Sequence, residues 1–156
     1  MIVVADNSPL SALSEIGLID LLPSLYDGVT IPVSVSHEAM HVGAPASLRA
    51  WMSSPPAWLT VVPDPDLLPE VASLDPGEAA AISLAWQSRP EALVIVDDRA
   101  ARRLCEALAI PCTGIAGLPL VAARAGLVDF EDAMQRLQAT TFRLSGSVIE
   151  QLRRRL

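Results

Sequence analysis

The stretch Met1-Ile2-Val3-Val4-Ala5-Asp6-Asn7-Ser8-Pro9-Leu10 opens the chain and decides how the rest of it folds. Residues 2–5 are apolar without alternation, which is typical of a short strand covered on both faces by helices. Ser8 followed by Pro9 predicts a helix start, because serine caps helix amino ends and proline suits the first helical turn. Asp6 therefore lies between the carboxyl end of a strand and the amino end of a helix. In open α/β sheets, ligands bind at this position.

The rest of the chain alternates strands with helices. We expect further strands at 29–32, 59–62, 93–96 and 110–113. We expect helices at 10–25 (interrupted at Gly17), after Ser34 or Ser36 as the cap, at 46–53, at 79–86, through Arg102, Leu104 and Leu108, at 117–125, and from 129 onward. This alternation implies a mostly parallel sheet with right-handed crossovers. We therefore predict one α/β domain spanning residues 1–156, with a central, mostly parallel sheet flanked by helices and a C-terminal helical segment at about 129–156.

The segment 42–76 is rich in proline and is otherwise expected to be loop. It carries Trp51 and Trp58, which can cover an edge of the core or form a subunit contact; we expect them to be buried within the monomer.

Composition limits the classes of function. The net charge of −7 disfavours nonspecific binding to nucleic acid, yet all 11 lysine or arginine positions are arginine, the better fork for phosphate. We expect Cys105 and Cys112 to be reduced, small apolar residues of an intracellular protein. No apolar run approaches the ~20 residues that span a bilayer, and no signal-peptide pattern opens the chain, so we expect a cytoplasmic protein.

Acidic residues follow strands or start helices at four places: Asp6, Glu38, Glu78 and the pair Asp97-Asp98. Because parallel strands direct their carboxyl ends to one edge of a sheet, these carboxylates can converge. Packed carboxylates repel one another unless a divalent cation neutralises them, and their hard oxygen atoms suit Mg²⁺ or Mn²⁺. Each acid also has a purely structural interpretation, since Asp98 can cap the next helix and Asp75 with Glu78 fits a capping box.

A second metal motif overlaps Glu38. His37-Glu38-Ala39-Met40-His41 matches H-E-x-x-H, which on a helix places two histidines on one face for zinc and predicts a metalloprotease. The sequence contains no third histidine, and its first 36 residues leave no room for the antiparallel sheet of such a protease. Two exposed helix histidines are the simpler interpretation.

Four sequence motifs follow one another along the chain: Ala5-Asp6-Asn7-Ser8-Pro9-Leu10 with Ala12-Leu13, Ile31-Pro32 through Glu38, Asp75-Pro76-Gly77-Glu78-Ala79, and Val96-Asp97-Asp98-Arg99 with Arg102 or Arg103. Together they resemble the PIN-domain superfamily of metal-dependent ribonucleases, and more narrowly a prokaryotic PIN-like group. The resemblance covers nearly the whole chain and implies a three-layer α/β/α fold. Members often have aspartate where this chain has Glu78.

The resemblance also implies a site and its partners. Asp6, Glu38, Glu78 and Asp98, with Asp97 as a further candidate, would be the catalytic and metal-binding acids that hold Mg²⁺ or Mn²⁺. The substrate would be RNA, and many members are toxins silenced by a small antitoxin protein.

We expect further polar contacts to the substrate from Asn7, Ser8, Arg99, Arg102 and Arg103, although one arginine could instead pair with Asp97. We also expect a homodimer without membrane association. A catalytically idle binding or regulatory module remains the alternative, because its sequence would look much the same.

Overall fold

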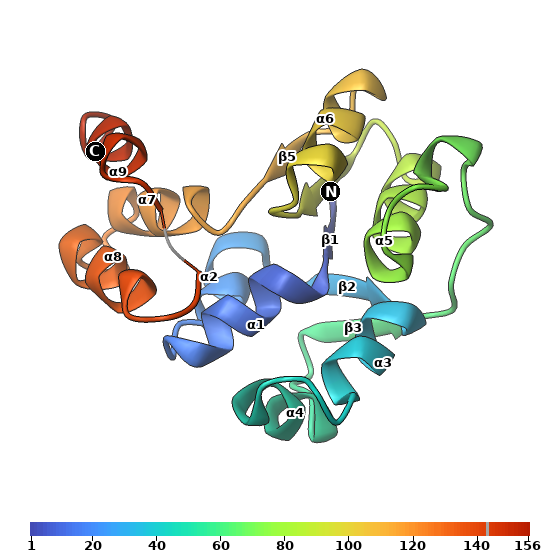
Figure 1. Ribbon diagram of the computed structural model, residues 1–156, viewed down its shortest axis with the longest axis horizontal. Coiled ribbons are helices and arrows are strands. Elements are labelled where there is room, and N and C mark those ends of the chain that lie inside the picture. Colours follow the sequence, from blue (N-terminus) through green and yellow to red (C-terminus); the bar gives the residue numbers. More distant parts are fainter. Residues whose placement is uncertain (143) are drawn as a thin grey trace.

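The computed structural model describes residues 1–142 and 144–156, and within them the chain forms one five-stranded parallel sheet (Figure 1). The strands are β1 (Ile2–Ala5), β2 (Val29–Pro32), β3 (Leu59–Val62), β4 (Ala92–Ile95) and β5 (Cys112–Thr113), in the order β3-β2-β1-β4-β5. The predicted α/β class with a parallel sheet is confirmed. The expected last strand, 110–113, is shorter than predicted because Pro111 has no N–H to donate; its carbonyl still accepts from Val94 N at 3.0 Å.

Helices connect and flank the strands. They are α1 (Asn7–Glu15), α2 (Leu21–Tyr26), α3 (Val33–Met40), α4 (Ala46–Ser53), α5 (Pro76–Gln87), α6 (Arg99–Ala107), α7 (Gly117–Arg124), α8 (Phe130–Gln138) and α9 (Gly146–Arg153), with a 3-10 turn η1 (Pro69–Val71) in the segment expected to be loop. Gly17 breaks the first helical pattern as expected; its φ of 72° is a backbone conformation that glycine adopts without strain.

Alternate side chains of the sheet enter two separate apolar cores. Val3, Ala5 and Ile95 face the larger core with α1, α2, α3, α4, α7, α8 and α9. Val4 and Val94 face the smaller core with α5 and α6. Burial on both faces explains why residues 2–5 are apolar without alternation, and it makes the fold a three-layer α/β/α arrangement.

Two predicted helix caps are wrong. Ser8 lies inside α1, because Asp6 already occupies the cap position and Asn7 is the first helical residue. Ser34 and Ser36 lie inside α3. The amide of Ser34 donates instead to Asp64 Oδ1 at 2.9 Å, and its hydroxyl donates to the other oxygen of Asp64. A carboxylate from the proline-rich loop therefore satisfies the amino end of α3, a contact between residues 30 positions apart.

Trp51 and Trp58 pack on each other and on the larger core. Their ring centroids lie 5.6 Å apart in a tilted arrangement. Both rings are half-buried against that core, as expected for burial within the monomer.

Both cysteines are free thiols, Cys105 buried and Cys112 half-buried. Burial is the main cause that raises the pKa of Cys105 to about 12, so this thiol stays protonated and unreactive near neutral pH.

Candidate acidic active site

Asp6 and Asp97 follow the two neighbouring strands at the centre of the sheet. Ala5 at the end of β1 is in register with Ile95 at the end of β4, and Asp6 N donates to Ile95 O at 3.0 Å. The chain passes from β1 through β2 to β3 on one side and returns to β4 on the other, so these aspartates lie where the strand order reverses. In parallel α/β sheets this reversal opens the crevice in which ligands bind.

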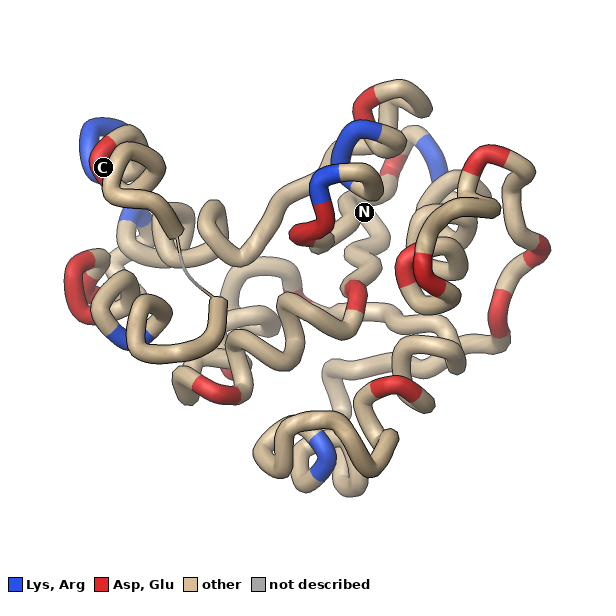
Figure 2. Tube along the Cα trace, in the orientation of Figure 1, with Lys and Arg blue, Asp and Glu red and all other residues tan. Residues whose placement is uncertain are grey.

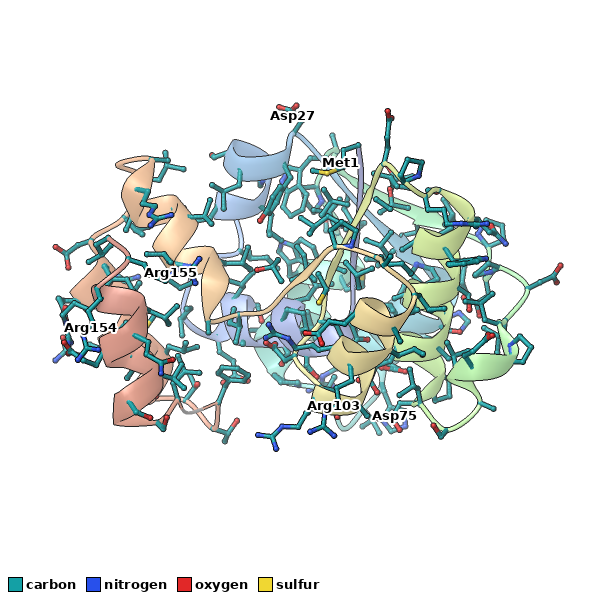
Figure 3. All side chains as sticks on the ribbon, turned by 90° about the horizontal axis from the view of Figure 1, so that it is seen from above. Met1, Asp27, Asp75, Arg103, Arg154 and Arg155 are labelled. Atoms are coloured by element: carbon teal, nitrogen blue, oxygen red, sulfur yellow. The ribbon has the colours of Figure 1, made fainter. Side chains whose placement is uncertain are left out.

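The amino and carboxyl ends of the parallel strands lie on opposite sides of the molecule, and different residues border them (Figure 3). Met1 and Asp27, which precede β1 and β2, lie at one edge of the molecule, and Asp75 and Arg103 lie at the opposite edge. Arg103, one of the residues predicted to contact the substrate, therefore lies on the side of the molecule opposite the start of β1.

Asp6 is the most buried acid, with 4% of its surface exposed. Burial is the main cause that raises the pKa of its carboxyl group to about 7. A hydrogen bond from the Asn7 amide lowers the pKa, and the negative charges of Glu78, Glu38 and Asp97 raise it. Carboxylates from four separate segments therefore act on one another. Figure 2 shows acidic segments of α3, α5 and the ends of β1 and β4 around the same region.

Glu78 lies in the first turn of α5 and is 7% exposed. Burial is the largest cause that raises the pKa of Glu78 to about 7, followed by the negative charges of Asp98 and Asp75. A hydrogen bond from the backbone of Asp75 lowers this pKa. The side chain of Asp75, at the cap position, makes no cap hydrogen bond. The predicted capping box is therefore incomplete, and Glu78 is a buried carboxylate that faces other carboxylates.

Gly77 lets Glu38 reach the site. Its amide donates to Glu38 Oε1 at 2.9 Å, which ties α3 to the start of α5. A Cβ at position 77 would lie 2.6 Å from the same oxygen, so only glycine fits without displacing the carboxylate. Burial raises the pKa of Glu38, the Gly77 hydrogen bond lowers it, and the charge of Asp75 raises it.

Asp97 and Asp98 have different environments. Asp98 Oδ2 accepts from Ala101 N at 2.9 Å, so Asp98 caps α6, which is the structural interpretation considered for it. Asp97 Oδ1 accepts from Ile115 N at 2.7 Å, while burial raises the pKa of Asp97. Gly114 makes this contact possible, because a Cβ there would lie 2.6 Å from Asp97 Oδ1. Sequence reasoning missed this role of Gly114, whose only signal was a glycine turn after β5.

Three buried oxygen atoms at the strand ends have no hydrogen-bond partner in the described part of the chain: Asp6 Oδ1, Asn7 Oδ1 and Asp97 Oδ2. Such atoms are costly unless a donor or a cation satisfies them. Their hard, partly anionic oxygen chemistry fits Mg²⁺ or Mn²⁺. In residues 1–142 and 144–156, no three acidic, histidine or cysteine side chains are close enough to share one ion. Mg²⁺ usually keeps several water ligands and is bound by one or two carboxylates, so the Asp6 and Asp97 oxygens suit it without a third protein ligand.

Arginines border the acidic site on the side of α6. Arg99, Arg102 and Arg103 line a pocket of about 360 Å³ together with Asp97 and Glu106. The positive charge of Arg102 lowers the pKa of Asp97. The two groups therefore attract each other, which is the alternative role that the sequence allowed for one of these arginines. The pocket joins guanidinium groups to the acidic site.

His37 and His41 are exposed, on and just after α3. With Asn7 and Glu38 they line an open pocket of about 530 Å³. His41 Nδ1 accepts from Gly43 N at 3.1 Å, so one of its two possible metal-binding nitrogens is occupied. Two exposed histidines match the simpler interpretation of the H-E-x-x-H motif.

Fold and site together define a parallel α/β protein with buried carboxylates and flanking arginines where its strand order reverses. A family model described as a PIN domain matches residues 2–156, and the chain belongs to this family. PIN domains are generally nucleases that use divalent metal ions, so the fold is of a nuclease type. Neither a comparison with curated proteins nor one with solved structures found a match. Among the described residues, no helix has the length and apolar character needed to cross a membrane.

Proposed function

We propose that this protein is a divalent-metal-dependent endoribonuclease that hydrolyses phosphodiester bonds in RNA. The observation that carries the proposal is the pair of partnerless buried oxygens, Asp6 Oδ1 and Asp97 Oδ2, at the carboxyl ends of neighbouring strands. Glu78 and Glu38 supply further negative charge from α5 and α3. Asp98 contributes charge while it caps α6.

Mg²⁺ or Mn²⁺ in this site would activate water for attack on phosphorus and stabilise the leaving oxygen. Asp6 and Asp97 would hold the ion from the rigid ends of β1 and β4, and Gly77 N fixes the orientation of Glu38. The guanidinium groups of Arg102 and Arg103 fit the non-bridging oxygens of a phosphate and would hold the RNA backbone beside the acids. The positive charge also offsets the repulsion between RNA and the carboxylates.

The proposal has two further parts, of which the first is supported by the family resemblance. A small antitoxin protein would silence the nuclease by covering the carboxyl edge, and two copies would form a homodimer. Purification with co-expressed genomic neighbours, followed by measurement of mass in solution, tests both.

The decisive experiment compares cleavage of labelled single-stranded RNA with Mg²⁺, with Mn²⁺ and with EDTA. Asp6→Asn and Asp97→Asn should each abolish metal-dependent cleavage, whereas Asp66→Asn, at an exposed position, should retain it. Cleavage that survives EDTA, or equal activity in all three variants, would overturn the proposal. Metal binding without cleavage would favour the idle module, and stoichiometric zinc lost on replacing His37 and His41 would favour the protease.

A further inference from the structure

A second, more enclosed pocket begins directly beside the acidic site. It has a volume of about 260 Å³ and is lined by Asn7, Ser8, Ser11, Ala12, Glu15, Thr141 and Phe142. Asn7 immediately follows Asp6 and also lines the pocket that contains Glu38. Asn7 is therefore shared by this pocket and by the pocket that contains Glu38, and it is the chain neighbour of Asp6.

One face of α1 forms the floor of this pocket. Ser8, Ser11 and Glu15 are spaced three and four positions apart, so their side chains lie along one side of the helix. This stripe runs from the residues next to Asp6 to the last residue of α1. It offers two hydroxyl groups and one carboxylate in a row.

The segment after α8 forms the opposite wall and is held in place by its own hydrogen bonds. Thr140 Oγ1 donates to Leu137 O at 2.7 Å and accepts from Phe142 N at 3.1 Å. The ring of Phe142 is half-buried and packs against the larger core, which supports it on one side. This segment returns to α1 although more than a hundred residues separate them (Figure 1).

The chemistry of the lining selects a nucleobase. An aromatic ring in a pocket lining is a stacking surface for an unpaired base, and hydroxyl and amide groups can pair with the polar edge of that base. The Glu15 carboxylate would repel a phosphate but accepts hydrogen bonds from amino and imino groups, as carboxylates do from cytosine N4. The volume is below the range of pockets for drug-sized ligands, which suits one planar base.

We propose that this pocket binds one unpaired base of the RNA substrate, stacked on Phe142 and read by Glu15, with guanine preferred because its adjacent N1–H and N2–H groups match the two carboxylate oxygens. The inference rests on the proposed function for the identity of the polymer. It makes the protein selective for single-stranded RNA, because a base inside a duplex cannot enter the pocket.

The test measures binding in EDTA, which prevents metal-dependent cleavage. Two labelled oligoribonucleotides are compared, one of uridine alone and one with a single central guanosine. The parent should bind the guanosine strand about tenfold more tightly, a discrimination within the range of one good base contact. Glu15→Gln should remove most of this preference. Glu91→Gln, an exposed charge change at the opposite edge of the sheet, should leave it intact.

Phe142 provides a second, independent variant. Phe142→Ala should weaken binding of both strands by about tenfold, a loss typical of one stacked base, and Phe142→Tyr should restore it. Thermal unfolding of each variant confirms that the fold is intact. Equal affinity of the parent for both strands, or an unchanged ratio in Glu15→Gln, would overturn the pocket. The same result with Glu91→Gln as with Glu15→Gln would also overturn it.

Cleavage of the same strands with Mn²⁺ separates this inference from the proposed function. Guanosine preference without any metal-dependent cleavage would keep the base pocket and reject the nuclease. Metal-dependent cleavage without the preference would do the reverse.

Discussion

Removing the charge of Asp6 should stabilise the metal-free protein. The pKa of this carboxyl group is 3.8 in its ordinary state and about 7 in the folded protein, where burial is the main cause. Between these two values the folded state holds a proton that the unfolded state releases, so the free energy of unfolding falls as pH rises. The loss is complete above about pH 7, where the folded protein must bury the ionised group. Below about pH 4 the full stability is present.

The size of the effect follows from the two pKa values. Their difference corresponds to about 4 kcal/mol at high pH, of which about 3 kcal/mol develops between pH 5 and pH 8. Asparagine resembles the neutral acid and does not titrate, so Asp6→Asn should gain this amount over the parent as pH rises. For a chain of 156 residues the gain corresponds to roughly 6–12 °C in melting temperature.

Thermal unfolding in EDTA at about pH 5 and about pH 8 measures the effect. Asp66→Asn, at an exposed position, is the matched control: it keeps Asp6, so its melting temperature should follow that of the parent at both pH values. Excess Mn²⁺ at the higher pH should raise the melting temperature of the parent by mass action and leave Asp6→Asn unchanged. A variant less stable than the parent at the higher pH, or equal Mn²⁺ stabilisation of both proteins, would refute the reasoning.

Three further variants probe the rest of the site. Glu78→Gln should lower RNA cleavage by about 10²-fold, a barrier increase of about 2.7 kcal/mol, without lowering the melting temperature; cleavage at the parent rate would leave Glu78 as a helix residue only. Gly114→Ala should weaken Mn²⁺ binding in calorimetry, because its Cβ would lie 2.6 Å from the aspartate oxygen it faces, whereas Gly146→Ala has open space and should bind normally. Replacing Arg102 and Arg103 by Gln should weaken RNA binding and flatten its salt dependence, because fewer phosphate contacts release fewer counterions on binding. An unchanged slope of affinity against salt concentration would place both side chains outside the RNA path.

The sequence was informative wherever the chemistry is local. Apolar runs without alternation located buried strands, and acids next to those runs had to reach the carboxyl edge once the strands were parallel. The neighbours of each strand could not be predicted in the same way, because periodicity contains no information about which strand pairs with which. The adjacency of Asp6 and Asp97 depends on β4 pairing with β1, which only the structure shows.

Contacts between distant residues account for what was missed. Asp64 satisfies the amino end of α3 from a loop that has no regular pattern of its own. Ile115 is likewise distant in sequence from Asp97, yet its amide donates to the Asp97 carboxylate and so gives Asp97 a different environment from Asp98. Phe142 reaches α1 from the other end of the chain. In each case the partner is defined by three-dimensional proximity, and no spacing in the sequence encodes it.

The pairing of β1 with β4 has a consequence for when the acidic site forms during synthesis. β1 gains its second neighbouring strand only when β4 is synthesised, because Ile2 is in register with Ala92, about ninety residues later. Until then the first half of the chain can pair β1 with β2 and β2 with β3, but Asp6 has no Asp97 beside it. A ribosome-bound or truncated chain that ends before β4 therefore lacks Asp97, one of the two acids on which the proposed nuclease activity depends. Two fragments divided in the exposed turn between α5 and β4 should each be inert, and should regain the centre only when they associate.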